Sequence, residues 1–228
     1  MYNSKVSWDK AYNNNQMAWP AEYIIRILKG SYPNLDLKKV IRPGMKLCDV
    51  GFGDGRNFLV YNQLGLDMYG VEITEAIVQK VKEELDNLDV QRLDLKVGNN
   101  KNIPYESGIF DFLVLWNSCY YMGKENIDFN DYVKEFARVI KKESYLILSI
   151  PKKTCFIYKN SKEIKQGYRM ITEDPFNVRN GEILRMFESE EEIQTVFEPY
   201  FNDFVFGSIH DDCFGFNYHW HLVVCKRK

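Results

Sequence analysis

Short apolar runs alternate with amphipathic stretches along most of the chain. The apolar runs predict strands near residues 46–50, 67–72, 92–97, 110–116 and 144–150. Apolar positions three and four residues apart predict helices near residues 20–29, 55–64, 75–86 and 128–141. Strands and helices in this order favour an α/β fold, doubly wound, in which a mostly parallel sheet has helices on both faces.

The alternation breaks after residue 151. Asn180-Gly181, a pair typical of tight turns, lies between the apolar segments 168–171 and 183–187. We therefore expect two short strands within a small β insertion over residues 152–187, after the fifth strand.

The last part of the chain returns to a regular pattern. Ser189 precedes a run of acidic residues, which favours a helix capped by this serine. Strands near 202–209 and 216–225 then complete the sheet. Residues 1–40 precede the first strand, so we expect them to form a helical N-terminal cap on a single domain over residues 1–228.

A glycine-rich segment follows the first predicted strand. Asp49 ends the apolar run, and Gly51, Gly53 and Gly55 occupy alternate positions after it. Glycines let a chain that leaves a strand and opens a helix pass close to a ligand, because no Cβ blocks the approach. A dinucleotide turn would need its third glycine at Arg56. The segment predicts a turn around a different small molecule.

The second predicted strand ends in another acid. Glu72 lies 23 residues after Asp49 and is followed by Ile73 and a helical pattern. A carboxylate at this point accepts both hydrogen bonds of a ribose diol, and its charge strengthens them. The alternative is a solvated acid near a helix N-terminus, where the helix dipole favours negative charge.

The segment Asp49-x-Gly51-x-Gly53-x-Gly55 resembles motif I of the class I S-adenosylmethionine-dependent methyltransferases. In that family the third strand ends in a Gly-Asp pair whose acid often meets the adenine amino group. This chain has Gly98-Asn99, and an amide oxygen also accepts from an amino group, although without charge. An alternative is that Asn99-Asn100 is only a polar turn.

The resemblance implies a seven-stranded sheet with an antiparallel last strand and S-adenosylmethionine as the cofactor. The residues that it implies for cofactor binding are Asp49, Gly51, Gly53, Gly55, Glu72, Ile73, Asn99, Asn100 and Asn117. Aromatic N-terminal residues cap the adenosine or the acceptor in related small-molecule enzymes, so we add Trp8, Tyr12 and Trp19. Packing of these rings onto the sheet is the alternative.

Two segments are candidates for contact with the acceptor. Asn117-Ser118-Cys119-Tyr120-Tyr121 follows the fourth strand. Its Asn117 and Tyr120 resemble the Asn/Asp-Pro-Pro-Tyr turn of amino-methylating enzymes, but both prolines are absent. We interpret it as a cofactor-and-substrate loop. In the insertion, an arginine such as Arg179 would grip a carboxylate or phosphate through two parallel bonds if it faced the cleft.

All three histidines lie within twelve residues near the C-terminus. Histidine is suited to removing a hydroxyl proton near neutral pH, so we predict His210 or His219 as the catalytic base. The alternative is that each is a polar residue of the last strands. No metal site is expected, because third and fourth ligands at matching spacing are missing.

Composition limits the classes of partner and compartment that the sequence predicts. The net charge of -2 provides no general field for nucleic acid, although lysines recur between Lys141 and Lys165. The five cysteines have no C-x-x-C spacing, no stretch of eighteen apolar residues occurs, and residues 1–8 hold no apolar leader core. We expect a cytoplasmic protein without a membrane segment.

The sequence therefore favours an enzyme that methylates a small-molecule acceptor, with a hydroxyl of a sugar or related metabolite preferred. One alternative is a nucleic-acid or protein methyltransferase that uses the lysines. Another is a non-catalytic module that binds the cofactor. The frequent Asn, Lys, Ile and Tyr residues are typical of an AT-rich bacterial genome, whereas nothing in the sequence assigns an oligomeric state.

Overall fold

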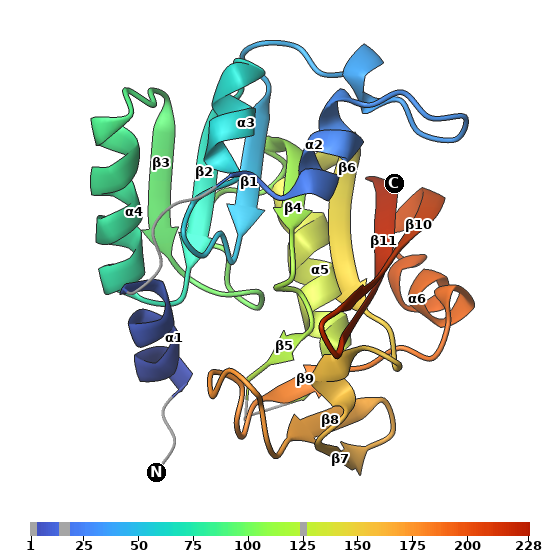
Figure 1. The fold of residues 1–228 in the computed structure, drawn as a ribbon. Coiled ribbons are helices and arrows are strands. Elements are labelled where there is room, and N and C mark those ends of the chain that lie inside the picture. The colour runs from blue at the N-terminus through green and yellow to red at the C-terminus, as the bar shows by residue number, and fades with distance from the viewer. Residues whose placement is uncertain (1–3, 14–18, 124–126) are drawn as a thin grey trace.

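The computed structural model describes residues 4–13, 19–123 and 127–228. Its centre is a seven-stranded sheet in the order β10-β11-β6-β4-β1-β2-β3 (Figure 1). The strands are β1 (Lys46–Val50), β2 (Asp67–Glu72), β3 (Leu93–Val97), β4 (Phe110–Leu115), β6 (Ile140–Pro151), β10 (Phe201–Cys213) and β11 (Phe216–Arg227). Neighbours from β3 to β6 are parallel, and β11 is antiparallel to β6 and β10. The predicted fold class is confirmed.

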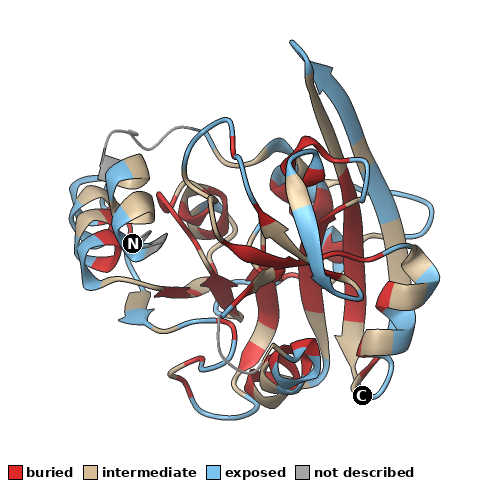
Figure 2. Ribbon diagram, turned by 90° about the horizontal axis from the view of Figure 1, so that it is seen from below, coloured by how far each residue is buried: buried red, intermediate tan, exposed pale blue. Residues whose placement is uncertain are grey.

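Helices cover both faces of this sheet. On one face lie α2 (Glu22–Lys29), α3 (Phe58–Gln63) and α4 (Glu75–Asn87), and on the other α5 (Phe129–Val139) and α6 (Glu190–Phe197). The central strands are buried on both sides, which is why they read as continuous apolar runs (Figure 2). As predicted, Ser189 caps α6, and its Oγ accepts a hydrogen bond of 3.2 Å from the Glu192 amide.

A second, four-stranded sheet lies at the carboxyl ends of the central strands (Figure 1). It contains β5 (Tyr121–Met122), β7 (Ser161–Lys165), β8 (Tyr168–Ile171) and β9 (Ile183–Arg185), in the order β5-β9-β8-β7. The two strands predicted for the insertion are β8 and β9, which pair antiparallel. Residues 172–182 connect them, so Asn180-Gly181 ends a longer connection instead of forming a two-residue hairpin.

Several element boundaries differ from the predictions. The helix expected from residue 55 begins at Phe58, because Gly55 has a φ of +75° that no helix accommodates. The strand expected from residue 144 begins at Ile140. Strands β10 and β11 pair with each other beyond the end of β6, so their hairpin projects from the sheet (Figure 2). Phe214 in its turn is fully exposed.

The remaining elements are short. The helix α1 (Ser4–Asn13) lies near the N-terminal end of α4 (Figure 1). The elements η1 (Leu37–Lys39) and η2 (Phe156–Tyr158) are single helical turns. None of the helices in the described part of the chain combines the length and apolar character needed to cross a membrane.

Candidate active site

The turn after β1 carries the glycines and borders two cavities. Gly51 and Gly53 have φ values of +75° and +61°. A Cβ on Gly51 would lie 2.5 Å from the Cβ of Ser118, and one on Gly53 would lie 2.6 Å from the Tyr12 hydroxyl. Both positions therefore require glycine for conformation and for space. Gly55, also with a positive φ, shapes the turn but lines neither cavity.

Asp49 lies beneath this turn and faces neither cavity. Its carboxylate is buried, and Oδ2 accepts hydrogen bonds from the Tyr61 hydroxyl at 2.8 Å and the Asn57 amide at 3.5 Å. Burial raises the pKa of Asp49 to about 7, against the opposing effect of those two bonds. The residue thus ties the turn to the start of α3.

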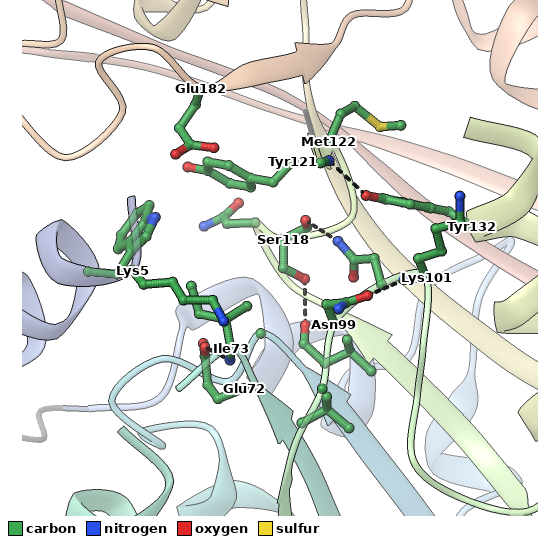
Figure 3. Close-up of a pocket in the computed structure, with 18 of the residues that line it drawn as sticks. Lys5, Glu72, Ile73, Asn99, Lys101, Ser118, Tyr121, Met122, Tyr132 and Glu182 are labelled. Atoms are coloured by element: carbon green, nitrogen blue, oxygen red, sulfur yellow. Dashed lines mark hydrogen bonds between the residues drawn. The ribbon is translucent and has the colours of Figure 1, made fainter. Parts of the chain in front are cut away.

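The first cavity, which we call the strand-end cavity, has a volume of about 350 Å³ and opens over β1, β2 and β4 (Figure 3). Glu72 and Ile73 form part of its wall. The two Glu72 carboxylate oxygens accept hydrogen bonds from the amides of Gly53 at 3.0 Å and Ile73 at 2.7 Å. Burial raises the pKa of Glu72, while both amide bonds oppose this rise. Each oxygen retains a lone pair for a further donor.

The two asparagines after β3 have different surroundings within the strand-end cavity. Asn99 is exposed, and its Oδ1 accepts from the amides of Lys101 at 2.9 Å and Asn102 at 3.0 Å. Asn100 is buried, and its Nδ2 donates to the Ser118 carbonyl at 2.9 Å. The Oδ1 of Asn100 has no hydrogen-bond partner among the described residues. A buried acceptor of this kind gains stability from a ligand N–H.

The second cavity, which we call the aromatic cavity, has a volume of about 450 Å³. It shares a wall with the strand-end cavity, and the residues common to both are Trp8, Tyr12, Gly51, Asn117 and Tyr121. Its other walls include eight aromatic rings, those of Tyr23, Phe52, Trp116, Tyr120, Phe156, Phe176, Tyr218 and Trp220. This arrangement suits a flat, largely apolar body next to whatever the strand-end cavity holds.

Asn117 stands at the boundary between the cavities. Its φ of +57° is uncommon for a residue with a side chain. Its amide donates to the Ser149 hydroxyl at 2.7 Å, and that hydroxyl donates back to Asn117 Oδ1 at 2.7 Å. Because Ser149 is fully buried on β6, this pair of bonds fixes the unusual backbone at the point where β4 ends.

The N-terminal helix covers the shared wall. The rings of Trp8 and Tyr12 stack with centroids 5.7 Å apart, and Trp8 packs edge-on against Tyr121. The Lys80 ammonium of α4 donates to the Tyr12 carbonyl, which attaches α1 to that helix. Burial, followed by the charge of Glu72, raises the pKa of the Tyr12 hydroxyl, so this group stays protonated. Trp19 is 86% exposed and lines neither cavity.

The structure does not bring His210 or His219 to either cavity. They are paired across β10 and β11, with ring centroids 4.3 Å apart. Their strand neighbours Ile209, Asp211, Tyr218 and Trp220 line the aromatic cavity. Because successive residues of a strand point to opposite faces, both histidines face away from it. No group of three or more His, Cys, Asp or Glu side chains is arranged for a metal ion within the described ranges.

Sequence reasoning missed most walls of the aromatic cavity. Phe156, Phe176 and Trp220 come from three separate segments, and no local motif marks them. The alternating rings of Phe216, Tyr218 and Trp220 are the one regular signal, since alternation on a strand places such residues on one face.

Known proteins support the class of domain. The methyltransferase domain family matches residues 48–148 of this chain. Over 105 residues the chain is 28% identical to the demethylmenaquinone methyltransferase of Bacillus mycoides, a match covering 44% of this chain and 42% of that protein. The chain therefore spans less than half the length of the curated relatives it matches.

Solved structures share this fold over most of the chain. A Pyrococcus horikoshii protein aligns with a TM-score of 0.66 and 17% identity over 96% of this chain and 99% of that one. A protein described as an S-adenosylmethionine-dependent methyltransferase, from Methanosarcina mazei, aligns with a TM-score of 0.63 and 16% identity over 86% and 98%. These structures agree with the predicted fold, and the family match over residues 48–148 confirms the resemblance inferred from the glycine turn.

Proposed function

We propose that this protein is an S-adenosylmethionine-dependent methyltransferase that acts on a small-molecule acceptor. The observation that carries the proposal is the strand-end cavity, where the glycine turn, the Glu72 carboxylate and the partnerless Asn100 oxygen converge. This cavity shares a wall with the aromatic cavity. A donor and an acceptor held in adjoining cavities are the requirement for direct transfer.

The residues that line the strand-end cavity match the groups of the cofactor. Glu72 is suited to accept from the ribose hydroxyls, and Asn100 Oδ1 to accept from the adenine amino group. Gly51 and Ile73 offer close backbone approach, while Asn117, Trp8 and Tyr12 separate this cavity from its neighbour. Asp49, Gly53 and Gly55 hold the turn in shape. Asn99 is assigned a lesser part, because its side-chain oxygen already accepts two amide bonds.

The reaction requires no covalent intermediate with the protein. The bound cofactor supplies a methyl group already activated on a sulfonium. The chain's own residues align the acceptor at the boundary beside Asn117 and exclude water with the rings of α1. Tyr12 keeps its proton and therefore acts there as a hydrogen-bonding group, not as a base.

A hydroxyl of a sugar or a related metabolite is the acceptor group that we propose first. The volume of about 450 Å³ lies within the range of small-molecule sites, and the flat rings suit the apolar face of such a compound. The expected base, His210 or His219, is left out of this mechanism because both rings face away from the cavity.

The alternatives have less support. The lysine-rich stretch is divided between the ends of β6, so Lys141 and Lys152 stand about 36 Å apart along the strand. This separation argues against one basic face for nucleic acid. A module that only binds the cofactor would not need the adjoining aromatic cavity. We also propose one domain over residues 1–228 in the cytoplasm, and the five free thiols agree with a reducing compartment.

Thermal unfolding tests the cofactor assignment. S-adenosylmethionine and S-adenosylhomocysteine should each raise the melting temperature, because both bind the native state. NAD is the control and should have no effect. A shift with NAD and none with either sulfur compound would overturn the proposal. Incubation with methyl-labelled cofactor and a bacterial metabolite extract, followed by mass spectrometry, then identifies the acceptor.

A further inference from the structure

Arg179 lies in the wall of the aromatic cavity with its guanidinium held in place. Its Nε donates to the Tyr121 hydroxyl at 2.9 Å, and its Nη1 donates to Asp174 Oδ1 at 2.8 Å. The rings of Trp8 and Phe176 lie 5.9 and 6.0 Å from its Cζ. With 16% of the side chain exposed, this arginine is fixed in one orientation by contacts that do not use all its donors.

Two donors remain side by side at this point. Nη2 of Arg179 has no hydrogen-bond partner among the described residues. Nε and Nη2 donate from the same edge of a guanidinium, so Nη2 lies next to the Tyr121 hydroxyl that Nε holds. That hydroxyl accepts from Arg179, so its own hydrogen is available to another group. Burial raises the pKa of Tyr121, and it therefore keeps this hydrogen.

The charges around the cavity leave Arg179 as the buried cation. Among the other charged residues of the wall, Asp54 binds Arg56, and Glu22 binds Arg26. Asp211 is exposed on the projecting hairpin, where water screens its charge. The carboxylate of Asp174 lies outside the wall and also accepts from the Val178 and Arg179 amides at 2.9 and 3.3 Å. The buried carboxylate of Glu182 lines the strand-end cavity instead, and its charge adds to burial in raising the pKa of Tyr121.

We propose that Arg179 and Tyr121 bind an anionic group of the acceptor, a carboxylate or a phosphate, while the acceptor body lies against the aromatic walls. This inference rests on the proposed function. Arg179 borders the aromatic cavity and not the strand-end cavity, so the anion belongs to the acceptor and not to the cofactor's carboxylate. Because Tyr121 lies in the shared wall, an anion held there fixes the acceptor close to the boundary.

Matched aromatic probes test the charge preference. The protein saturated with S-adenosylhomocysteine is titrated by calorimetry with benzoate, phenyl phosphate, benzamide and benzylamine. The two anions should bind at least about tenfold more tightly than the neutral amide and the amine, as expected for hydrogen bonds to a charged group. Equal affinity for benzoate and benzamide, or a preference for benzylamine, would overturn the proposal.

Variants assign the preference to these residues. Arg179→Gln and Tyr121→Phe should each reduce the preference for benzoate, with about a tenfold loss for the arginine variant. Arg169→Gln is the control, because Arg169 lies in the same insertion, binds Ser161 and lines neither cavity. If Arg179→Gln unfolds with Asp174 left unpaired, the double variant D174N/R179Q replaces it. Unchanged benzoate affinity in the folded variant contradicts the assignment.

Cofactor analogues separate the two sources of a carboxylate. The affinities of S-adenosylhomocysteine and of 5′-methylthioadenosine, which lacks the amino acid, are compared between the wild-type protein and Arg179→Gln. Arg179→Gln should leave both affinities within about twofold of wild type. A selective loss of S-adenosylhomocysteine binding would place the anion in the cofactor and overturn the proposal. A wild type that binds neither compound refutes the proposed function, while benzoate titration of the cofactor-free protein still reports on Arg179.

Discussion

The two cavities of the candidate site are built from very different lengths of chain. Apart from α1 and Glu182, the wall of the strand-end cavity comes from residues 50–132. The wall of the aromatic cavity extends from Trp8 to Trp220 and draws on α1, the turn after β4, η2, the β8–β9 connection and the terminal hairpin. The strand-end cavity is thus encoded largely by short motifs at strand ends, whereas the aromatic cavity depends on tertiary assembly.

A physical difference accompanies this contrast. The strand-end cavity presents the Glu72 carboxylate, which the Gly53 and Ile73 amides hold in place, and the buried Asn100 side chain. These groups require particular residues at particular positions. The aromatic cavity presents many ring faces, and Tyr, Phe and Trp replace one another on such walls at modest cost. We therefore expect substitutions to be tolerated more readily in the aromatic cavity than in the strand-end cavity.

The largest effect is expected from adding one methyl group to the glycine turn. In Gly51→Ala, the new Cβ meets Ser118 at 2.5 Å, so the turn or the loop after β4 must move. S-adenosylhomocysteine binding should weaken by at least about 1,000-fold, measured by calorimetry. The control is Gly108→Ala, which also has a positive φ but has nothing within 4 Å of its Cβ, and it should bind normally. Equal behaviour of the two variants would show that the turn is not an approach surface.

The next effect concerns stability of the cofactor-free protein. With its pKa raised to about 7, folded Asp49 holds a proton that the unfolded chain releases near pH 4. The folded state binds more protons between these values, so this residue lowers the free energy of unfolding as pH rises from about 4 to 7.

Asp49→Asn should remove this penalty. The variant should gain stability relative to wild type as pH rises, by up to about 4 kcal/mol at pH 8, measured by urea unfolding. Groups shared by both proteins cancel in the difference. Asp86→Asn, an exposed position on α4, should differ from wild type by less than about 0.5 kcal/mol. A constant difference for Asp49→Asn between pH 5 and 8 would contradict the protonated state.

Glu72 tests the polar half of the comparison. Glu72→Gln loses the charged acceptor, so cofactor binding should weaken by about 1.5–3 kcal/mol, the range for hydrogen bonds to charged groups. Calorimetry with S-adenosylhomocysteine measures this loss. Glu75→Gln, an exposed residue in the first turn of α4, is the matched control. Normal affinity in Glu72→Gln would assign the ribose contact to another residue.

The sequence predicted the central strands because they are buried on both faces, so that β1 and β4 appear as mainly apolar runs. It missed β7, whose Ser161–Lys165 segment is polar and mostly exposed, and β5, which has two residues. These strands owe their conformation to pairing with β8 and β9, which no local pattern reports.

The same division holds for the site. Gly51 and Glu72, which the sequence singled out, line the strand-end cavity because strand ends place them there by local geometry. The sequence could not predict the difference between Asn99 and Asn100. It depends on tertiary contacts, because Asn99 Oδ1 accepts from an amide of the turn while Asn100 Nδ2 donates to the Ser118 carbonyl. The sequence could not show that His210 and His219 face away from the aromatic cavity, since a strand pattern gives alternation but not which face meets the cavity.

A smaller effect should separate the two asparagines. Asn100→Ala removes the buried acceptor and should weaken S-adenosylhomocysteine binding by about tenfold. The same substitution should have much less effect on the binding of S-inosylhomocysteine, the analogue that lacks the adenine amino group. Asn99→Ala is the comparison and should have the smaller effect on both. A stronger loss in Asn99→Ala, specific to the adenine compound, would reverse the assignment.

The smallest effect is expected from the histidines on the acceptor side. His210→Ala and His219→Ala should each leave the initial rate of methyl transfer from labelled cofactor within about twofold of wild type, with the same pH profile, because both rings face away from the aromatic cavity. Loss of a general base would instead reduce the rate by about 10²–10⁴-fold. Such a reduction, with S-adenosylhomocysteine affinity unchanged, would mean that the hairpin changes its register or twists when the acceptor binds. The acceptor side would then be assembled not only from distant segments but also in a conformation that forms with the substrate, and the contrast with the preformed glycine turn would be sharper still.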